Sequence, residues 1–318
     1  MNISYGISAA TYIQKWLPWR VSQRIEQAID THLRNQSRIY LEKTLSLSVD
    51  SQNALVEIHQ LLGRRHVGMG IWSLKSLIKT ANLRLAVVIH DDGSLTQEDT
   101  DLMHRHLPGV RIIMRAEADL AVRKMLSDYR ACTNFRFGEV LVTNHRGQSY
   151  NMFIMALILF DINLLARSDK IIILDADVLF FRRPDIIVDW ATNPTDRRSL
   201  YSVEAYKPKR EKNGSLSFDK KAAHTLNSGL ICFSKSALFN LETIEDWIAS
   251  NQDLMYTSPV FEQLCYSYLI KRQLDSVELD PALYGFNYTS KDSVFTHFGI
   301  KRGFFENISR VATILSCE

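Results

Sequence analysis

A short apolar run that ends in two aspartates constrains this chain more than any other segment. Residues Lys170-Ile-Ile-Ile-Leu174 have no polar member after the lysine, and Asp175-Ala176-Asp177 follows directly. Such a run is typical of a strand buried on both faces of a parallel sheet. Because side chains alternate along an extended chain, we expect Asp175 and Asp177 to face one side and Ala176 the other.

Two carboxylates at the end of a buried strand repel each other unless a cation lies between them or they share a proton. Oxygen ligands favour a hard divalent ion such as Mg²⁺ or Mn²⁺, which often carries substrate phosphates. The alternative interpretation is a strand that ends in two solvated, helix-capping aspartates. The apolar residues that continue from Val178 to Phe181 favour the metal site.

Strand-like and helix-like segments alternate along the middle of the chain. We expect strands over Ala54–Leu62, Leu83–Ile89, Val110–Met114 and Lys170–Leu174, and helices over His66–Thr80, Glu117–Tyr129 and Tyr150–Leu165. Two overlapping capping boxes, Ser94 with Gln97 and Thr96 with Asp99, predict the start of another helix. This alternation predicts an α/β fold with a mostly parallel central sheet, flanked by helices, and a site at the carboxyl ends of the strands.

The first fifty residues have a different character. Apolar residues recur at three- and four-residue steps between Val21 and Tyr40, which predicts an amphipathic helix. Tryptophans and arginines make the region aromatic and basic: Trp16, Trp19, Arg20, Arg24, Arg34 and Arg38. The helix either docks on a membrane surface or a partner, or packs on the main domain; a basic amphipathic pattern alone is weak support for the first. We therefore predict an N-terminal helical extension over residues 1–52 and one domain over 53–318.

Composition narrows the class of protein. The chain has 38 Lys and Arg against 35 Asp and Glu, a formal charge of +3, which does not indicate a nucleic-acid binder. The longest apolar run, residues 152–160, is about half the length that a membrane span needs. The N-terminus does not resemble a secretory signal, and the four cysteines lie too far apart to suggest a disulfide framework or a zinc knuckle. We predict a cytoplasmic chain without a transmembrane segment, with at most a weak peripheral contact at the inner membrane face.

Two classes of enzyme place Asp-x-Asp after a hydrophobic strand. In haloacid-dehalogenase-like phosphatases the first aspartate is a nucleophile, and the motif lies on the first strand. In nucleotide-sugar glycosyltransferases the pair binds a metal and a diphosphate in the middle of the chain. Here at least three expected strands precede Asp175, and no Gly-Asp-x-x-x-Asp follows it, so position favours the second class.

Four motifs follow one another along the chain: Ser168–Leu179 with Asp-x-Asp, Leu226–Ile231 with Asn-Ser-Gly, the pair Glu262-Gln263, and Thr296–Lys301 with His, Gly and Lys. In this order they resemble glycosyltransferase family 8, the glycogenin-like branch of the GT-A fold. The resemblance covers about residues 55–305. It implies a GT-A fold and transfer of a sugar from a nucleotide-diphosphate sugar, preferably a UDP-sugar, with retention of anomeric configuration.

The resemblance also implies the residues of the site. Asp175, Asp177 and His297 would bind the metal. Asn227, Glu262 and Gln263 would complete the catalytic centre beside the donor sugar. The remaining donor contacts would come from Ala176, Ser228, Gly229, Gly299, Lys301 and Arg302.

The chemistry of these side chains agrees with those roles. A neutral imidazole beside two carboxylates shifts selectivity from Mg²⁺ towards Mn²⁺. Lys301 and Arg302 carry the charge that a departing nucleoside diphosphate requires. The exit of the first strand, Leu62-Gly63-Arg64-Arg65, lies where α/β folds bind nucleotides, since Gly63 permits close approach and either arginine can meet a diphosphate.

Each motif has a plainer alternative. His297 would then be a histidine without a metal, and Asn227–Gly229 would form a turn before a strand. The pair Glu262-Gln263 would lie on an exposed helix face, and Arg64-Arg65 would lie in a solvated loop. The segment His90-Asp91-Asp92-Gly93 is interpreted as a turn rather than as a second metal site.

Two departures from the family leave the donor sugar open. The closing segment reads His-Phe-Gly-Ile-Lys-Arg-Gly-Phe instead of His-x-x-Gly-x-x-Lys-Pro-Trp, and residues 151–166 have no Lys or Arg where relatives carry a basic donor contact. The sequence therefore predicts a metal-dependent glycosyltransferase with an unassigned acceptor, whether glycan, lipid, peptide or small molecule. A phosphatase with Asp175 as nucleophile and a non-catalytic nucleotide-sugar-binding protein are the alternatives.

Overall fold

A computed structural model describes residues 19–50, 54–139, 141–143, 149–151, 153–204, 209–210, 216–217, 225–299 and 301–316. Seven strands form its central sheet: β1 (Val56–Leu62), β2 (Ala86–Asp91), β3 (Arg111–Ile113), β6 (Lys170–Leu174), β8 (Ser199–Glu204), β11 (Thr225–Ser234) and β12 (Ser276–Glu278). Their spatial order is β12-β8-β11-β6-β1-β2-β3. All neighbours are parallel except that β11 runs antiparallel to both β6 and β8. The predicted mostly parallel sheet is confirmed.

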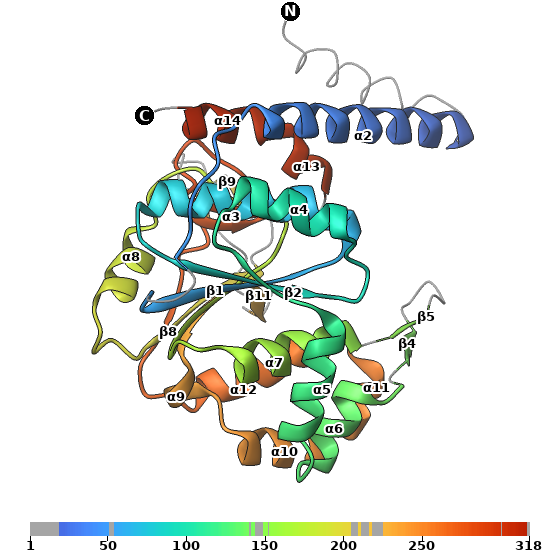
Figure 1. Cartoon of the computed structure of the whole chain (residues 1–318), viewed down its shortest axis with the longest axis vertical. Helices are drawn as coiled ribbons and strands as arrows, with labels where there is room; N and C mark the ends of the chain where they lie inside the picture. The colour runs from blue at the N-terminus through green and yellow to red at the C-terminus, as the bar shows by residue number, and fades with distance from the viewer. Residues whose placement is uncertain are drawn as a thin grey trace, which may run out of the picture.

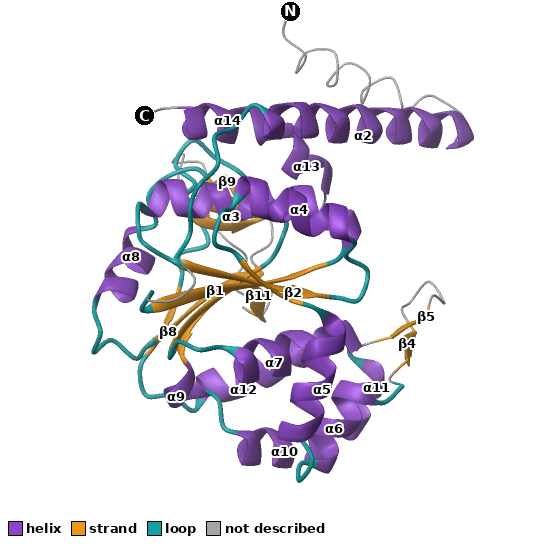
Figure 2. Ribbon diagram, in the orientation of Figure 1, coloured by secondary structure: helices purple, strands orange, loops and turns teal. Residues whose placement is uncertain are grey.

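Helices cover both faces of this sheet (Figures 1 and 2). One face carries α3 (Val67–Ala81), α4 (Gln97–His106) and α14 (Ile308–Ser316). The other carries α5 (Arg115–Met125), α6 (Arg130–Phe137), α7 (Phe153–Leu165), α10 (Leu241–Ser250), α11 (Gln252–Thr257) and α12 (Phe261–Lys271). Two further helices, α8 (Asp185–Thr192) and α9 (Lys235–Leu238), follow strands. All five residues of β6 are buried, as expected for a strand enclosed between two helical layers.

Local signals account for several boundaries and fail at others. The Thr96–Asp99 capping box is present at the start of α4. The helix predicted from Tyr150 begins instead at Phe153, because residues 149–151 form β5 (Ser149–Asn151) and pair with β4 (Leu141–Thr143). The helix predicted over 117–129 is α5, which ends at Met125, and the separate helix α6 was not predicted.

A second, three-stranded sheet brings the end of the chain back to the exit of β6. It contains β13 (Tyr284–Phe286), β14 (Phe295–His297) and β7 (Val178–Phe180), and β14 pairs antiparallel with β7. In this pairing His297 lies opposite Val178, the residue after Asp177. A separate hairpin pairs β9 (Lys209–Arg210) with β10 (Leu216–Ser217).

The predicted N-terminal helix is α2 (Trp19–Glu42), and it lies along α14 and α13 (Lys301–Glu306) (Figure 1). Its buried residues Leu33 and Leu41 belong to the same apolar core as α3, and Trp72 of α3 donates a hydrogen bond to the carbonyl oxygen of Ser37 at 3.3 Å. The helix therefore packs on the main fold. The predicted domain boundary at residues 52 and 53, Trp16 and Ile300 lie outside the described residues. Within the described ranges, no helix combines the length and apolar character needed to cross a bilayer.

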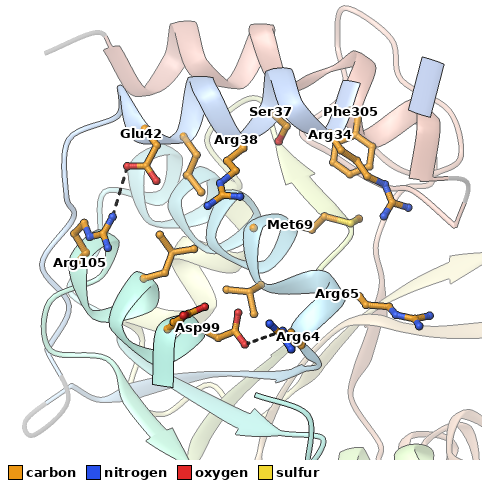
Figure 3. Close-up of a pocket in the computed structure, with 15 residues that line it drawn as sticks. Arg34, Ser37, Arg38, Glu42, Arg64, Arg65, Met69, Asp99, Arg105 and Phe305 are labelled. Carbon is orange, nitrogen blue, oxygen red and sulfur yellow. Dashed lines mark ion pairs between the residues drawn. The ribbon is translucent and has the colours of Figure 1, made fainter. Parts of the chain in front are cut away.

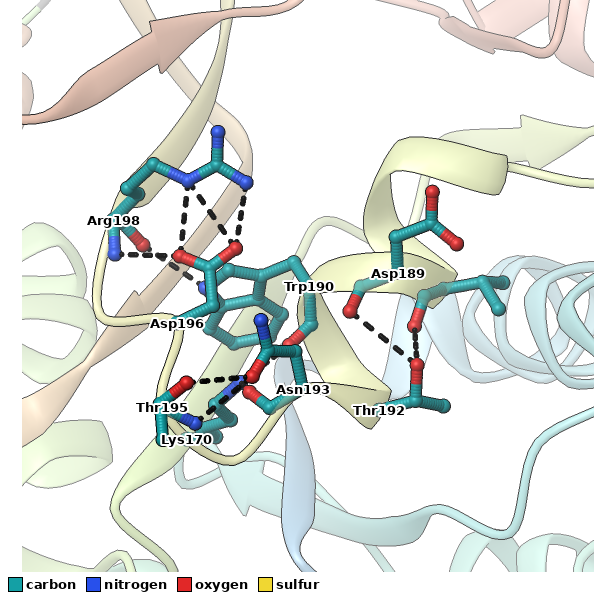
Figure 4. Close-up of polar contacts among 9 residues, drawn as sticks. Lys170, Asp189, Trp190, Thr192, Asn193, Thr195, Asp196 and Arg198 are labelled. Atoms are coloured by element: carbon teal, nitrogen blue, oxygen red, sulfur yellow. Dashed lines mark hydrogen bonds and ion pairs between the residues drawn. The ribbon is translucent and has the colours of Figure 1, made fainter.

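A buried lysine at the first residue of β6 contacts the end of α8. The ammonium of Lys170 donates to the carbonyl oxygens of Trp190 and, at 2.5 Å, Asn193 (Figure 4). The indole N–H of Trp190 in turn donates to the carbonyl oxygen of Arg198 at 2.9 Å. Because a buried cation needs such acceptors, these contacts hold the end of α8 against the first residue of the strand that leads to the aspartates.

Candidate functional site

The order in which strands are added to the sheet reverses between β1 and β6, which are parallel neighbours. From β1 the chain builds β2 and β3 on one side, whereas β6 lies on the other side of β1. Ligands of open α/β sheets bind at such a switch point, outside the carboxyl ends of the strands. A pocket of about 450 Å³ lies there and contains both predicted aspartates. Its lining comes from several separate segments of the chain and includes Gly63, Asp175, Asp177, Asn227, Glu262, His297 and Lys301.

Three potential metal ligands converge in this pocket. Nε2 of His297 lies 3.0 Å from a carboxylate oxygen of Asp177 and 3.6 Å from one of Asp175. The ligand atoms of all three lie within 4.8 Å of one another, although more than 100 residues separate His297 from the aspartates in sequence. Two hard carboxylates and one imidazole form a donor set that suits Mn²⁺ or Mg²⁺.

The backbone holds the two aspartates in place. Asp175–Asp177 form a turn between β6 and β7 rather than an extended strand, yet both carboxylates face His297. The N–H of Asp175 donates to the carbonyl oxygen of Gly229 at 3.0 Å, and the N–H of Phe298 donates to that of Asp177 at 2.8 Å. Ser73 of α3 donates to the carbonyl oxygen of Asp175 at 2.9 Å. The carboxylates are thus oriented by strands and a helix instead of by a free loop.

Asn227 determines which nitrogen of His297 is available. The Asn227 amide nitrogen donates to Glu204 at 3.2 Å, and its oxygen accepts from the N–H of Gly229 at 2.9 Å. That same oxygen lies 2.7 Å from Nδ1 of His297. Since an amide oxygen only accepts, Nδ1 carries the hydrogen and Nε2 is left to face the aspartates.

The charges in the pocket perturb one another. Burial lowers the pKa of His297, but the hydrogen bond and negative charge of Asp177 outweigh it, so the net shift is upward. Burial also raises the pKa of Asp175; the charge of His297 opposes this shift and that of Asp177 adds to it. Such a cluster favours a shared positive charge, which a proton or a divalent cation can supply.

The Asn-Ser-Gly motif lies inside β11, where the pairing with β8 shifts register between Asn227 and Ile231. The alternative that these residues form a turn before the strand is therefore wrong. A Cβ atom on Gly229 would lie 2.3 Å from Nδ1 of His297 and 2.7 Å from the side-chain oxygen of Asn227. Only glycine permits this close approach of the strand to the imidazole.

Glu262 and Gln263, at the start of α12, contact this irregular part of β11. Ser228 donates its hydroxyl to Glu262 at 3.0 Å and its N–H to Gln263 at 3.2 Å. The Glu262 side chain is fully buried, so the alternative of an exposed helix face is wrong for this residue. Burial raises the pKa of Glu262 to about 7, although the Ser228 hydroxyl opposes the shift.

We expect the raised pKa of Glu262 to make stability depend on pH. Between the ordinary value of 4.5 and about 7, the unfolded chain loses this proton while the folded chain retains it, so stability falls as pH rises through that window. The loss is about 3 kcal/mol. Urea unfolding of metal-free protein at pH 5 and pH 8 should show a fall in the free energy of unfolding that is smaller by about this amount in Glu262→Gln than in wild type. Equal pH dependence in wild type and variant would contradict the assignment.

A further part of the pocket lies at the exit of β1. Asp92, which follows β2, packs so closely on Gly63 that a Cβ there would meet its carboxylate at 2.1 Å. Lys301 donates to Nε2 of His66 across the pocket. Burial lowers the pKa of Lys301, and the neighbouring charges of Arg34 and Arg65 add to this effect while Asp177 opposes it. The segment 90–93, predicted as a turn, is one only in its second half: His90 and Asp91 end β2, and the chain turns after them, where Asp91 accepts the N–H groups of Gly93 and Leu95.

The predicted donor contacts, all within the described part of the chain, divide into two groups. Gly63, Ala176, Ser228, Gly299 and Lys301 line the pocket. Five others do not line it. Gly229 lies in β11 against the imidazole of His297. Leu62 is buried in the core, Arg302 forms an ion pair with Glu306 at 2.9 Å, and Arg64 and Arg65 line a different pocket.

Several lining residues were not identified from the sequence. Glu204 ends β8, and His66 follows the two arginines. An apolar wall comes from Leu61, Ile154, Met155, Ile158, Pro259, Val260 and Phe286. His66 directly follows the predicted nucleotide loop and could have been included on that ground, whereas nothing near Glu204 in the sequence indicates its contact with Asn227.

Comparison with known proteins supports the fold. No protein-family model matches the sequence, and the curated proteins provide no match. Among solved structures, the apo form of mouse xyloside xylosyltransferase 1 is similar with a TM-score of 0.52 at 11% identity, over 80% of this chain and 99% of that one. The galactosyltransferase LgtC, solved with donor and acceptor sugar analogs, has a TM-score of 0.50 at 12% identity, over 82% of this chain and 97% of that one. The chain therefore has the fold of these GT-A glycosyltransferases, as its motifs predicted.

Proposed function

We propose that this chain is a metal-dependent glycosyltransferase that transfers a sugar from a nucleoside diphosphate sugar, preferably a UDP-sugar, to an acceptor, with retention of configuration. The observation that carries the proposal is the convergence of Asp175, Asp177 and His297 at the switch point of the sheet. The similar structures, both glycosyltransferases by name, support the same class of reaction.

The proposed metal site consists of three side chains that lie close together. Asp175, Asp177 and His297 would hold Mn²⁺, or Mg²⁺, whose charge would stabilise the departing nucleoside diphosphate. Lys301 would add a second positive charge on the side of the pocket where His66 accepts its hydrogen bond. Gly63 and Asp92 form the wall where the nucleoside would lie, with the Asp92 carboxylate packed directly against the Gly63 backbone.

The opposite side of the pocket suits the sugar. Asn227, Ser228, Glu262 and Gln263 present amide, hydroxyl and carboxyl groups there, which are the partners that sugar hydroxyls require. Among the described residues, one oxygen of Glu262 has no hydrogen-bond partner. We assign Glu262 and Gln263 to the sugar site through their contacts with Ser228.

Calorimetry with UDP and GDP in the presence of Mn²⁺ tests the donor class. We expect UDP to bind with a Kd below about 1 mM, or roughly −4 kcal/mol. His297→Ala should weaken Mn²⁺ binding in the presence of UDP about tenfold or more, since it removes one of three ligands. His32→Ala, an exposed histidine on α2, is the matched control and should leave both affinities unchanged.

Three results would count against the proposal. If neither nucleotide binds, the donor assignment is wrong. An unchanged Mn²⁺ affinity in His297→Ala would remove the histidine from the site. Trapping of a phosphorylated Asp175 would instead establish the phosphatase chemistry, in which this aspartate is a nucleophile.

A further inference from the structure

A second pocket, of about 550 Å³, lies between α2, η2 (Arg64–His66), α3, α4 and α13 (Figure 3). Five arginines line it: Arg34, Arg38, Arg64, Arg65 and Arg105. Only three acidic residues accompany them: Glu42, Glu98 and Asp99. The lining therefore carries two more positive than negative charges, in a chain whose 318 residues have a formal charge of only +3.

The ion pairs within this pocket leave part of its positive charge without a partner. Arg64 lies 3.8 Å from Asp99, and Arg105 lies 3.7 Å from Glu42. Both pairs are long, and both arginine side chains are about 60% exposed, so each pair contributes little. Arg34 lies over the ring of Phe305 at 5.7 Å. Among the described residues, Arg38 and Arg65 form no ion pair.

The position of these arginines points to a ligand in the pocket. Arg38 extends from α2 towards α3 and α4, while Arg34 and Arg65 lie on the side away from Arg105 (Figure 3). The lining also has an apolar part, which includes the buried Leu41, Val67 and Met69. Guanidinium groups beside apolar side chains suit an anion that carries an organic part.

We propose that this pocket binds the phosphate group of a phosphate ester, with Arg38, which extends into it from α2, as the principal contact. A phosphate dianion accepts charge-assisted hydrogen bonds from a guanidinium group, and the positive charges of the other arginines in the lining add to the attraction. The volume exceeds what a bare phosphate needs and lies in the range of organic ligand sites. The phosphate belongs either to a soluble ester or to an anionic lipid headgroup.

This site is separate from the donor pocket but adjacent to it. The short helix η2 divides them: His66 lines the donor pocket, Arg64 and Arg65 line the second one, and Met69 lines both. The charges of Arg34 and Arg65 lower the pKa of Lys301, which places these two arginines within electrostatic reach of the donor side. The second pocket does not depend on Asp175, Asp177 or His297.

Calorimetry with phenyl phosphate tests the proposal, because this ester combines a dianion with an apolar ring. Wild type should show saturable binding, and Arg38→Gln should weaken it about tenfold, since a charge-assisted hydrogen bond is lost. Arg24→Gln is the matched control: it removes an exposed arginine from the same helix outside the pocket and should bind as wild type does. Asp177→Ala should also bind as wild type does, so this result and that of the UDP titration can be judged separately.

Co-sedimentation distinguishes the source of the phosphate. The wild-type chain and both arginine variants are mixed with phosphatidylcholine vesicles, with and without phosphatidylglycerol. Retention of wild type and Arg24→Gln, but not Arg38→Gln, on the anionic vesicles identifies a lipid headgroup; phenyl phosphate binding without vesicle retention identifies a soluble ester. Binding to neither probe, or equal loss in Arg24→Gln and Arg38→Gln, would overturn the proposal.

Discussion

Asp177→Ala is expected to lower kcat/KM for sugar transfer at least about 1000-fold, because it removes the carboxylate that lies closest to His297. Its effect on folding should be small. The Asp177 side chain is 23% exposed, and the hydrogen bond from Phe298 goes to its backbone carbonyl rather than to its carboxylate. Turnover of a UDP-sugar with Mn²⁺, measured beside the thermal unfolding midpoint, checks both parts of this prediction.

Asp185→Ala is a suitable control for this experiment. Asp185 lies in the first turn of α8, its side chain is 76% exposed, and its ion pair with Arg183 is at the surface. The Asp185→Ala substitution removes the same charge from a nearby segment outside the pocket, so kcat/KM should stay within about twofold of wild type. Retained activity in Asp177→Ala, or an equal loss in Asp185→Ala, would show that the aspartate cluster does not carry the reaction.

Gly229→Ala is expected to weaken Mn²⁺ binding in the presence of UDP about 100-fold. The added Cβ would lie 2.3 Å from Nδ1 of His297 and 2.5 Å from Cε1, distances that real side chains do not adopt. The imidazole must therefore move away from Asn227 and from the aspartates. Loss of a metal ligand's orientation usually costs 10- to 100-fold in affinity, and here the ligand itself is displaced. Titration of Mn²⁺ against the UDP complex measures the effect.

The chain offers a matched control for the same change. Gly68 lies in the first turn of α3, and a Cβ atom added there would meet nothing within 4 Å. Gly68→Ala should leave Mn²⁺ affinity unchanged and should not destabilise the protein, because alanine favours a helix more than glycine does. If Gly229→Ala binds Mn²⁺ as tightly as Gly68→Ala, His297 is not a ligand of the metal.

Local sequence determined the elements that lead into the site. The run Lys170–Leu174 has no polar member after its first residue, and the protein encloses it between helices as that pattern requires. The spacing of apolar residues in α2 and the capping box at Thr96 likewise identify helices, because these signals act over a few neighbouring residues. The GT-A fold followed from the order of four short motifs.

The tertiary structure alone decided how those motifs meet. β11 runs antiparallel to both of its neighbours and shifts register after Asn227. The residues around Asn227 indicate neither feature, because the direction and register of a strand depend on the strands with which it pairs. Packing of distant segments also brings Glu204 to Asn227. It places Arg64 and Arg65 in a second pocket instead of in the donor pocket. A sequence motif specifies the chemical groups that are available; packing of distant segments decides which of them face one another. Here that packing brings His297 to the aspartates and leaves the arginines to form a pocket with α2.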